Sequence, residues 1–313
     1  MTVLESFADW TSAQPNNWSD TAIERACHAI ADTVGSMIAG GREKVVQEVV
    51  AGLYRSSEGR AKNVGNDQTS EPSIAACINA SAAHLLELDD NYYPALTHAS
   101  AVSVPALLAL AQEYEANGSA VIDAYIIGLE LQAAIARGVN RSHYLAGWHG
   151  TGTIACIGTA GACARIMGLN RAGIINAMSI ATSMAAGNKA QFGTTTKTLQ
   201  CGLASRNAIA AAVTRVQQMQ PFDISTSVSS VRERFAPPSR TRSASMLTSL
   251  MSLTITATFL PSLFERTWFN KVVLPAPRKP DSTETGRRLS TVASSLAADM
   301  RISKLQSCLD VML

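Results

Sequence analysis

The sequence predicts an all-α fold for its first 218 residues. Apolar residues in this part recur every three or four positions over segments of helical length, which is the pattern of a helix with one buried face. Few segments show the alternation of a strand, and strands and helices do not alternate. Alanine, glycine and serine dominate the predicted buried faces, so neighbouring helices can approach closely. These observations indicate a compact helical bundle.

The most N-terminal of the predicted helices lies in TAIERACHAIADTVGSMIAGG, residues 21–41. Thr21 and Glu24 have the spacing of a capping box, in which each side chain bonds to the backbone of the other residue. Gly40 and Gly41 are typical of a helix end. The apolar residues between them fall on one face. We therefore expect a helix that begins at Thr21 and stops at the glycine pair.

The same pattern predicts further helices along this part of the chain. Pro105 suits the first turn of one of them, because a first-turn residue needs no backbone N–H donor. Asn170 suits the cap of another, since its side chain can accept a bond from the first turn. The expected ranges are 72–87, 104–116, 119–137, 151–167, 171–186 and 202–218.

Composition changes near residue 220. Of the last 93 residues, 26 are Ser or Thr, and 12 Lys or Arg stand against 7 Asp or Glu. Neither a helical nor a strand period is sustained there. We expect a helical domain over 1–218 and, over 219–313, a Ser/Thr-rich basic tail that is poorly packed or partly disordered. The uncharged stretch 246–264 is not expected to span a membrane, because hydroxyl residues and Pro261 interrupt it.

Charge and cysteine usage exclude several function classes. A formal net charge of +2 gives no field that would attract nucleic acid. The start of the chain lacks the basic and apolar regions of a signal peptide. The six cysteines form no CxxC pair and no cluster with histidine, so they are interpreted as small buried residues of a reduced protein. We expect a cytoplasmic protein with no metal site, nucleic-acid partner or membrane partner.

The segment GWHGTGT, residues 147–153, is the first candidate for chemistry. It lacks the Gly-Lys-Ser/Thr of a phosphate-binding loop, and its glycines do not have dinucleotide-binding spacing. It does place His149 before a predicted helix, whose free N–H groups and dipole favour an anion. A catalytic histidine facing a carboxylate and a turn histidine without a role are both compatible with this segment alone.

Two further segments carry dense polar chemistry. LELDDNYYPALTHAS, residues 86–100, puts carboxylates, phenols and an imidazole on one connecting loop, a combination suited to acid–base work. The alternative is that its aspartates end a helix in solvent and its tyrosines fill a gap. NKAQFGTTTKTLQCG, residues 188–202, places Lys197 before a helix expected near Gly202. That lysine suits either a carboxylate counter-charge or an ordinary solvated cation.

These three segments, in this order, resemble the MmgE/PrpD family, which includes 2-methylcitrate dehydratases, cis-aconitate decarboxylases and iminodisuccinate epimerase. The matching text is HLLELDDNYYPALTHASAVSVPALLALAQ, GWHGTGTIACIGTAGACARIMGLN and TTTKTLQCGLASRNAIAAA. The resemblance covers roughly the first two-thirds of the chain. It implies a helical main domain, an α+β lid formed by later sequence, and commonly a homodimer. Residues 219–313 do not resemble that lid, which points to a lid that is missing or replaced.

The resemblance also implies site residues. The family's acidic loop falls on Asp89 and Asp90, and its following histidine falls on His98. Its helix-mouth histidine falls on His149, and its lysine on Lys197. Tyr93 stands where the family frequently has histidine, and one extra residue precedes His98. The residues expected to bind substrate are Tyr93, Gly150, Thr151 and Lys197.

The function that this resemblance implies is a cofactor-independent reaction on a small polycarboxylate. A proton is removed beside a carboxylate, and loss of water, loss of carbon dioxide or reprotonation follows. The base is His149 or one of the aspartates Asp89 and Asp90, and the proton donor is Tyr144 or His98. Lys197 and the amides beyond His149 hold the carboxylates as charge develops. The alternative is a truncated or frameshifted family remnant without activity.

Overall fold

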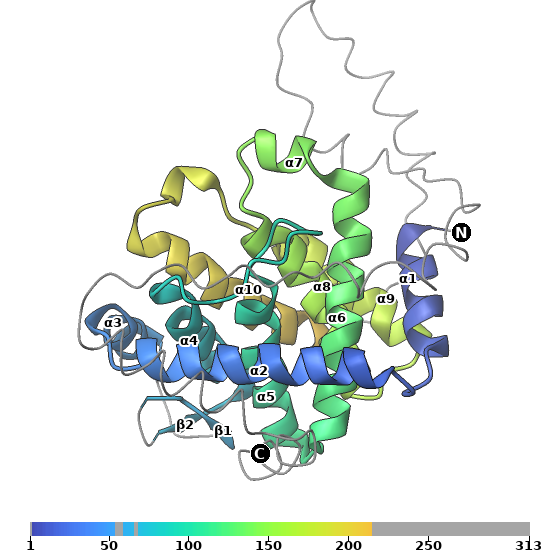
Figure 1. Cartoon of the computed structure of the whole chain (residues 1–313), viewed down its shortest axis with the longest axis horizontal. Helices are drawn as coiled ribbons and strands as arrows, with labels where there is room; N and C mark the ends of the chain where they lie inside the picture. The colour runs from blue at the N-terminus through green and yellow to red at the C-terminus, as the bar shows by residue number, and fades with distance from the viewer. Residues whose placement is uncertain (1, 54–58, 66–67, 215–313) are drawn as a thin grey trace, which may run out of the picture.

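The computed structural model describes residues 2–53, 59–65 and 68–214, and over these ranges the fold is a bundle of α-helices (Figure 1). A two-stranded antiparallel ribbon, β1 (Ala61–Lys62) and β2 (Thr69–Ser70), lies at one edge. The α-helices are α1 (Val3–Ala13), α2 (Asp20–Gly40), α3 (Lys44–Leu53), α4 (Pro72–Leu85), α5 (Ala99–Tyr114), α6 (Gly118–Val139), α7 (Ser142–Leu145), α8 (Gly150–Ile166), α9 (Arg171–Met184) and α10 (Thr195–Val213). The predicted all-α class is confirmed.

The centre of the bundle is formed by α5 and α8, which are buried almost along their whole length. Helix α8 packs between α6 and α10, and α10 also packs against α4. Small residues make these contacts close: a Cβ on Gly158 of α8 would lie 2.5 Å from Gln132 Cγ, and one on Gly202 of α10 would lie 2.6 Å from the Cys77 carbonyl oxygen. The expectation that small residues let the helices approach closely is confirmed.

Helix α6 shows how a core helix resembles a membrane span. Its length and hydropathy are sufficient to cross a bilayer, yet 67% of its most apolar window is buried inside the bundle. A helix that is apolar on all sides is expected wherever neighbours surround it.

A polar network holds the N-terminal half of α6. Asp123 accepts hydrogen bonds from Trp18 and from Arg165 of α8, each 2.8 Å long. Arg165 also donates to the carbonyls of Thr11 and Gln14, which ties α1 to the core.

Several helix ends confirm the predictions. Gly41 ends α2, and the Asn170 side chain accepts from the Gly173 N–H at the start of α9. The capping box at Thr21 was wrong: α2 begins at Asp20, and Ser19 caps it by accepting from the Ala22 N–H at 3.3 Å. Helices α1 and α3 had not been predicted.

Two helices begin earlier than the apolar period indicated. Helix α5 starts at Ala99, not at 104, so Pro105 lies inside it and not in its first turn. All residues from Ala99 to Ala111 are buried, so no polar face marks the true start. Helix α10 starts at Thr195, seven residues before Gly202, although β-branched residues are weak helix formers. Packing against α4 and α8 outweighs that local preference.

The five described cysteines, Cys27, Cys77, Cys156, Cys163 and Cys201, are free and buried, as expected. The predicted tail, including the 246–264 stretch and Cys308, lies outside the described residues.

Candidate active site

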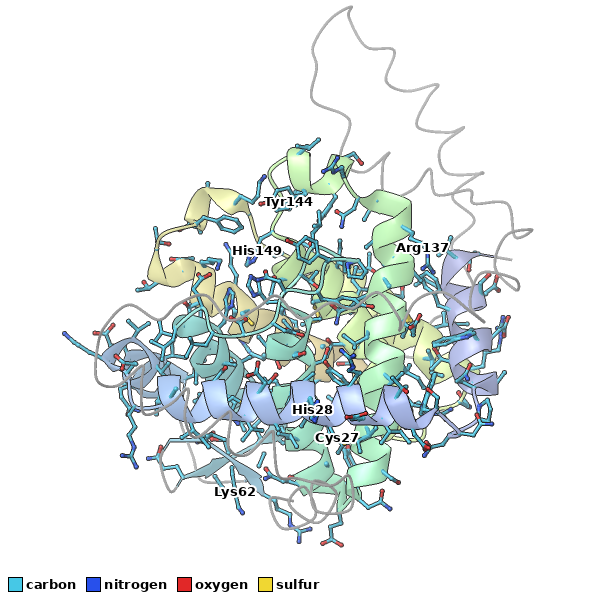
Figure 2. The ribbon with its side chains drawn as sticks, viewed as in Figure 1. Cys27, His28, Lys62, Arg137, Tyr144 and His149 are labelled. Atoms are coloured by element: carbon cyan, nitrogen blue, oxygen red, sulfur yellow. The ribbon has the colours of Figure 1, made fainter. Side chains whose placement is uncertain are left out.

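The ends of α4, α5, α8 and α10 bring the predicted polar segments together at one place in the bundle, where Figure 2 labels His149. His84 lies in the last turn of α4, His98 is the N-cap of α5, and His149 is the N-cap of α8. The ring centroid of His84 is 4.6 Å from that of His98 and 6.2 Å from that of His149. Helix termini position all three imidazoles, so rigid elements hold them.

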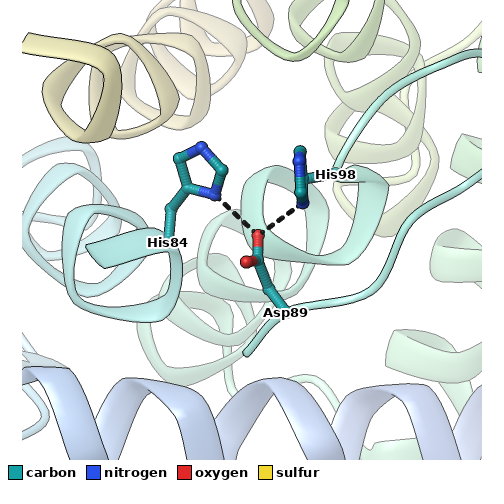
Figure 3. A group of neighbouring side chains, drawn as sticks. All are labelled: His84, Asp89 and His98. Carbon is teal, nitrogen blue, oxygen red and sulfur yellow. Dashed lines mark hydrogen bonds and ion pairs between the residues drawn. The ribbon is translucent and has the colours of Figure 1, made fainter. Parts of the chain in front are cut away.

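Asp89 joins two of these histidines (Figure 3). Its Oδ2 lies 2.7 Å from His84 Nδ1 in a hydrogen bond and 3.1 Å from His98 Nδ1. The second contact is an ion pair that is not aligned as a hydrogen bond. Burial disfavours the charge of Asp89, but the two imidazoles outweigh burial and hold the pKa of this carboxyl well below its usual range. Asp89 is therefore a buried carboxylate, and the alternative that it ends a helix in solvent is wrong.

His98 lies in surroundings that favour its protonated form. Burial lowers its pKa, but contact with Asp89 has the larger combined effect and raises the pKa above the ordinary value for histidine. Because Nδ1 faces Asp89, Nε2 is the ring nitrogen that can face a ligand. The His98 backbone N–H donates to the Thr151 hydroxyl at 3.0 Å, which links the start of α5 to the start of α8.

His149 has the opposite electrostatic character. Burial is the main cause that lowers its pKa to about 4, and the nearby charges of His84 and Lys197 add to it despite a hydrogen bond to Gln200. The ring is therefore neutral at physiological pH. Its Nδ1 lies 2.7 Å from Gln200 Oε1, and Gln200 Nε2 donates to the Asn188 carbonyl. Nδ1 accordingly carries the proton, which leaves a lone pair on Nε2 for general base work.

Lys197 completes the positive side of the cluster. It lies in the first turn of α10 and is buried, so the alternative of a solvated surface cation is wrong. Its Nζ is 5.5 Å from the centroid of the Phe192 ring, and that ring makes a T-shaped contact with His149 at 5.0 Å between centroids. Nζ also donates to the carboxylate of Glu87. The three predicted polar segments therefore meet in one cluster: 86–100, 147–153 and 188–202.

Asp90 differs from its neighbour. Its carboxylate accepts from the Ser100 backbone N–H at 3.2 Å and from the Ser100 hydroxyl at 2.6 Å, and that hydroxyl lies 2.7 Å from the Tyr125 hydroxyl. Burial raises the pKa of Asp90 to about 6. His98 makes no capping bond with its side chain, so Asp90 supplies the cap at the start of α5. This geometry gives Asp90 a positioning role beside His98.

The remaining predicted residues differ in exposure and in the contacts that they make. Tyr93 is 74% exposed. Tyr144 lies on α7, where Lys189 Nζ sits 3.6 Å from the centroid of its ring. Gly150 and Thr151 are buried in the first turn of α8, and a Cβ on Gly150 would come within 2.8 Å of the Leu96 carbonyl oxygen. Gly150 thus permits close contact between the 86–98 loop and α8.

Sequence reasoning missed four members of the cluster: His84, Glu87, Phe192 and Gln200. His84 and Glu87 stand just before the acidic pair, but the helical pattern there explained them as part of a predicted helix. Gln200 lies three residues after Lys197, one helical turn away, which would have placed it on the same face had the true start of α10 been recognised.

The donor set of this cluster also bears on metal binding. His84, Asp89 and His98 each offer one ligand atom, and these atoms lie within 4.8 Å of one another. The hydrogen bond and the ion pair to Asp89 already explain why these atoms are close. The arrangement therefore supports proton transfer and the orientation of the imidazoles, and it gives no independent reason to place a metal ion.

Known proteins match the part of the chain that contains this cluster. The model of the MmgE/PrpD N-terminal domain matches residues 5–220. Cis-aconitate decarboxylase of Homo sapiens is 28% identical over 218 residues, which are 67% of this chain and 45% of that protein. Cis-aconitate decarboxylase of Aspergillus terreus is 30% identical over 198 residues, 60% of this chain and 40% of that protein. The chain thus spans less than half the length of these relatives.

Proposed function

The chain belongs to the MmgE/PrpD family, and from this premise we propose that it is a lyase-class enzyme for a small polycarboxylate. The observation that carries the proposal is the pairing of His98 with His149. Their rings flank the same third imidazole, that of His84, and their environments shift their pKa values in opposite directions. Titratable pairs whose pKa values are pushed apart are typical of an acid and a base that act in one reaction.

Each member of the cluster takes a defined role in this proposal. Lys197 binds a substrate carboxylate, and its positive charge stabilises negative charge that develops on the neighbouring carbon. The Nε2 of neutral His149 accepts a proton from that carbon, or orients the carboxylate if no proton is removed. His98 donates a proton from Nε2, while Asp89 holds its ring and stabilises its charged form. Asp90 and Thr151 keep His98 in place.

Decarboxylation is the outcome that we favour, because the relatives above are cis-aconitate decarboxylases. In that reaction the bond to one carboxylate carbon breaks, and carbon dioxide leaves. The electron pair of that bond passes into the adjacent double bond and carboxylate. The carbon at the far end of the double bond then takes the proton of His98. This route needs a charged donor and a cation near the carboxylate, and His98 and Lys197 fit those roles.

Proton NMR in deuterium oxide tests the proposal with cis-aconitate, 2-methylcitrate, citrate and iminodisuccinate in turn. We expect solvent deuterium in the carbon-bound positions beside a carboxylate of one of them. His98→Ala should lower that rate by about 10²–10⁴-fold, since general acid–base groups contribute that much, and His149→Ala should do the same where the reaction removes a proton from carbon. His28→Ala, on α2, serves as the matched control and should retain the rate.

Two outcomes would contradict the proposal. If all four compounds remain free of deuterium and unconverted, the chain is not catalytic by itself, and the alternative of an inactive family remnant holds. If turnover occurs but both cluster variants retain it, the reaction takes place elsewhere in the chain.

A further inference from the structure

An ion pair within the cluster carries an inference about ligand selection. Glu87 and Lys197 bond directly, and their side chains differ greatly in exposure: 58% for the glutamate and 11% for the lysine. Burial raises the pKa of Glu87, but the hydrogen bond and charge of Lys197 have the larger combined effect and lower it. Glu87 is therefore ionised at neutral pH. A buried cation thus pairs with a carboxylate at the surface.

The lysine is the fixed partner of this pair. It sits in the first turn of α10, and its side chain is enclosed by protein. Its Nζ lies over the ring of Phe192, which makes a T-shaped contact with His149. The ammonium group is therefore next to the neutral histidine to which we assign base chemistry.

The glutamate is the partner that can move. It follows the last turn of α4, and its backbone N–H makes only a long bond of 3.4 Å to the His84 carbonyl. Its φ is 53°, in the left-handed region that few residues other than glycine adopt. Such positions are found preferentially at ligand clamps and switch regions. Because the side chain is exposed, the carboxylate can leave Lys197 without disturbing the core.

We propose that Glu87 is a specificity-determining residue whose carboxylate occupies Lys197 in the free protein and is displaced by a carboxylate of the ligand. The inference rests on the proposed function, because it assigns Lys197 to substrate binding. As a consequence, a ligand binds well only if it can replace the ion pair between Glu87 and Lys197. A ligand with a carboxylate replaces one ion pair with another, whereas a neutral ligand would leave the buried ammonium without its counter-charge. The site therefore selects carboxylates against their neutral analogues.

Binding of cis-aconitate to the full 313-residue chain, measured by isothermal titration calorimetry at fixed pH and low salt, tests this. We expect Glu87→Gln to bind about fivefold more tightly than wild type, because an ion pair with an exposed partner contributes up to about 1 kcal/mol that the ligand must otherwise displace. Glu115→Gln is the matched control. Glu115 also has a positive φ of 54°, and it pairs with Arg60 at 2.6 Å at the other end of α5. The affinity of Glu115→Gln for cis-aconitate should equal that of wild type.

Two further variants separate displacement from simple charge repulsion. Glu87→Asp keeps the negative charge but shortens the side chain, so it should bind more tightly than wild type if Glu87 must be displaced. It should bind like wild type if Glu87 only repels anions. Lys197→Met should weaken binding strongly, and adding Glu87→Gln to it should then have less effect than in the wild-type background. The trimethyl ester of cis-aconitate should bind weakly to every variant.

The proposal is overturned if Glu87→Gln binds cis-aconitate no more tightly than wild type, or if no variant binds it. It is also overturned if Glu87→Asp has wild-type affinity. These results are independent of turnover. Tighter binding by Glu87→Gln without deuterium incorporation would support the inference while contradicting the proposed function. Turnover, together with unchanged affinity in Glu87→Gln, would support the proposed function and contradict the inference about Glu87. Circular dichroism of each variant confirms that the helical bundle is retained.

Discussion

Asp89→Asn is expected to change the pH dependence of the reaction, not only its rate. The substitution removes the carboxylate that lies 3.1 Å from His98 Nδ1 and that raises the pKa of His98. Burial and the charge of Lys197, which lower this pKa, remain. An opposite charge at such a distance typically shifts a pKa by about 1–3 units, so the pKa of His98 should fall by that amount.

The magnitude follows from the protonated fraction of His98. At a pH above both pKa values, each unit lost reduces that fraction tenfold, so turnover near pH 8 should fall by about 10- to 10³-fold. Near pH 5 wild-type His98 is protonated, and the protonated fraction in the variant rises as the pH falls, so the difference in turnover should be smaller there than at pH 8. His149 has a pKa of about 4, so it remains an unprotonated base at pH 5.

The assay is the rate of cis-aconitate conversion between pH 4.5 and 9, together with the NMR titration of the His98 ring in the free protein. Asp9→Asn on α1 is the control: it breaks the exposed pair with Arg171 of α9 and should keep the wild-type profile. The reasoning is refuted if Asp89→Asn lowers the rate equally at all pH values, or if the His98 titration does not move to lower pH.

The same pKa shifts affect stability. His98 has a raised folded-state pKa, so its contribution to stability is fully present below its unfolded pKa and is lost as the pH rises through the folded value. Asp89 has a lowered folded-state pKa, so its contribution is present above its unfolded pKa and is lost in acid. Thermal unfolding of Asp89→Asn should therefore differ least from that of wild type in strong acid.

Two further predictions concern the base and the packing. Gln200→Glu places a carboxylate against His149 Nδ1, where its Oε1 now lies 2.7 Å away, and should raise the pKa of His149 by about 1–3 units. The acid limb of the rate profile should then move to higher pH, and an unchanged limb would remove His149 from the base role. Gly202→Ala should lower the free energy of unfolding by about 1–3 kcal/mol, because its Cβ would lie 2.3 Å from Ser81 Oγ and 2.6 Å from the Cys77 carbonyl oxygen. Gly35 lies in the exposed middle of α2, and a Cβ added there would have nothing within 4 Å, so Gly35→Ala should instead raise the free energy of unfolding by about 0.5–1 kcal/mol. Urea unfolding measures both variants, and equal effects would contradict the packing argument.

The sequence alone determined the helical class and the three segments that carry the chemistry. Helices α6, α8 and α9 were predicted to within about two residues at each end, because apolar periods and caps such as Asn170 mark them locally. His149 was expected at a helix N-terminus for the same reason, since its glycine-rich turn and the helix after it are adjacent in the chain. The division between residues 218 and 219 stays a prediction.

Only the tertiary structure decided which side chains act together and in what state of charge. Asp89 and Asp90 are neighbours in sequence, yet one lies between two imidazoles and the other caps α5 through Ser100. Lys197 was indistinguishable from a surface lysine until α10 was seen to begin before it and to bury it beside Phe192 and Glu87. His84, Glu87 and Gln200 belong to the cluster through contacts with residues up to 110 positions away. Burial and charge at such distances depend on how helices pack, which a local pattern of residues does not contain.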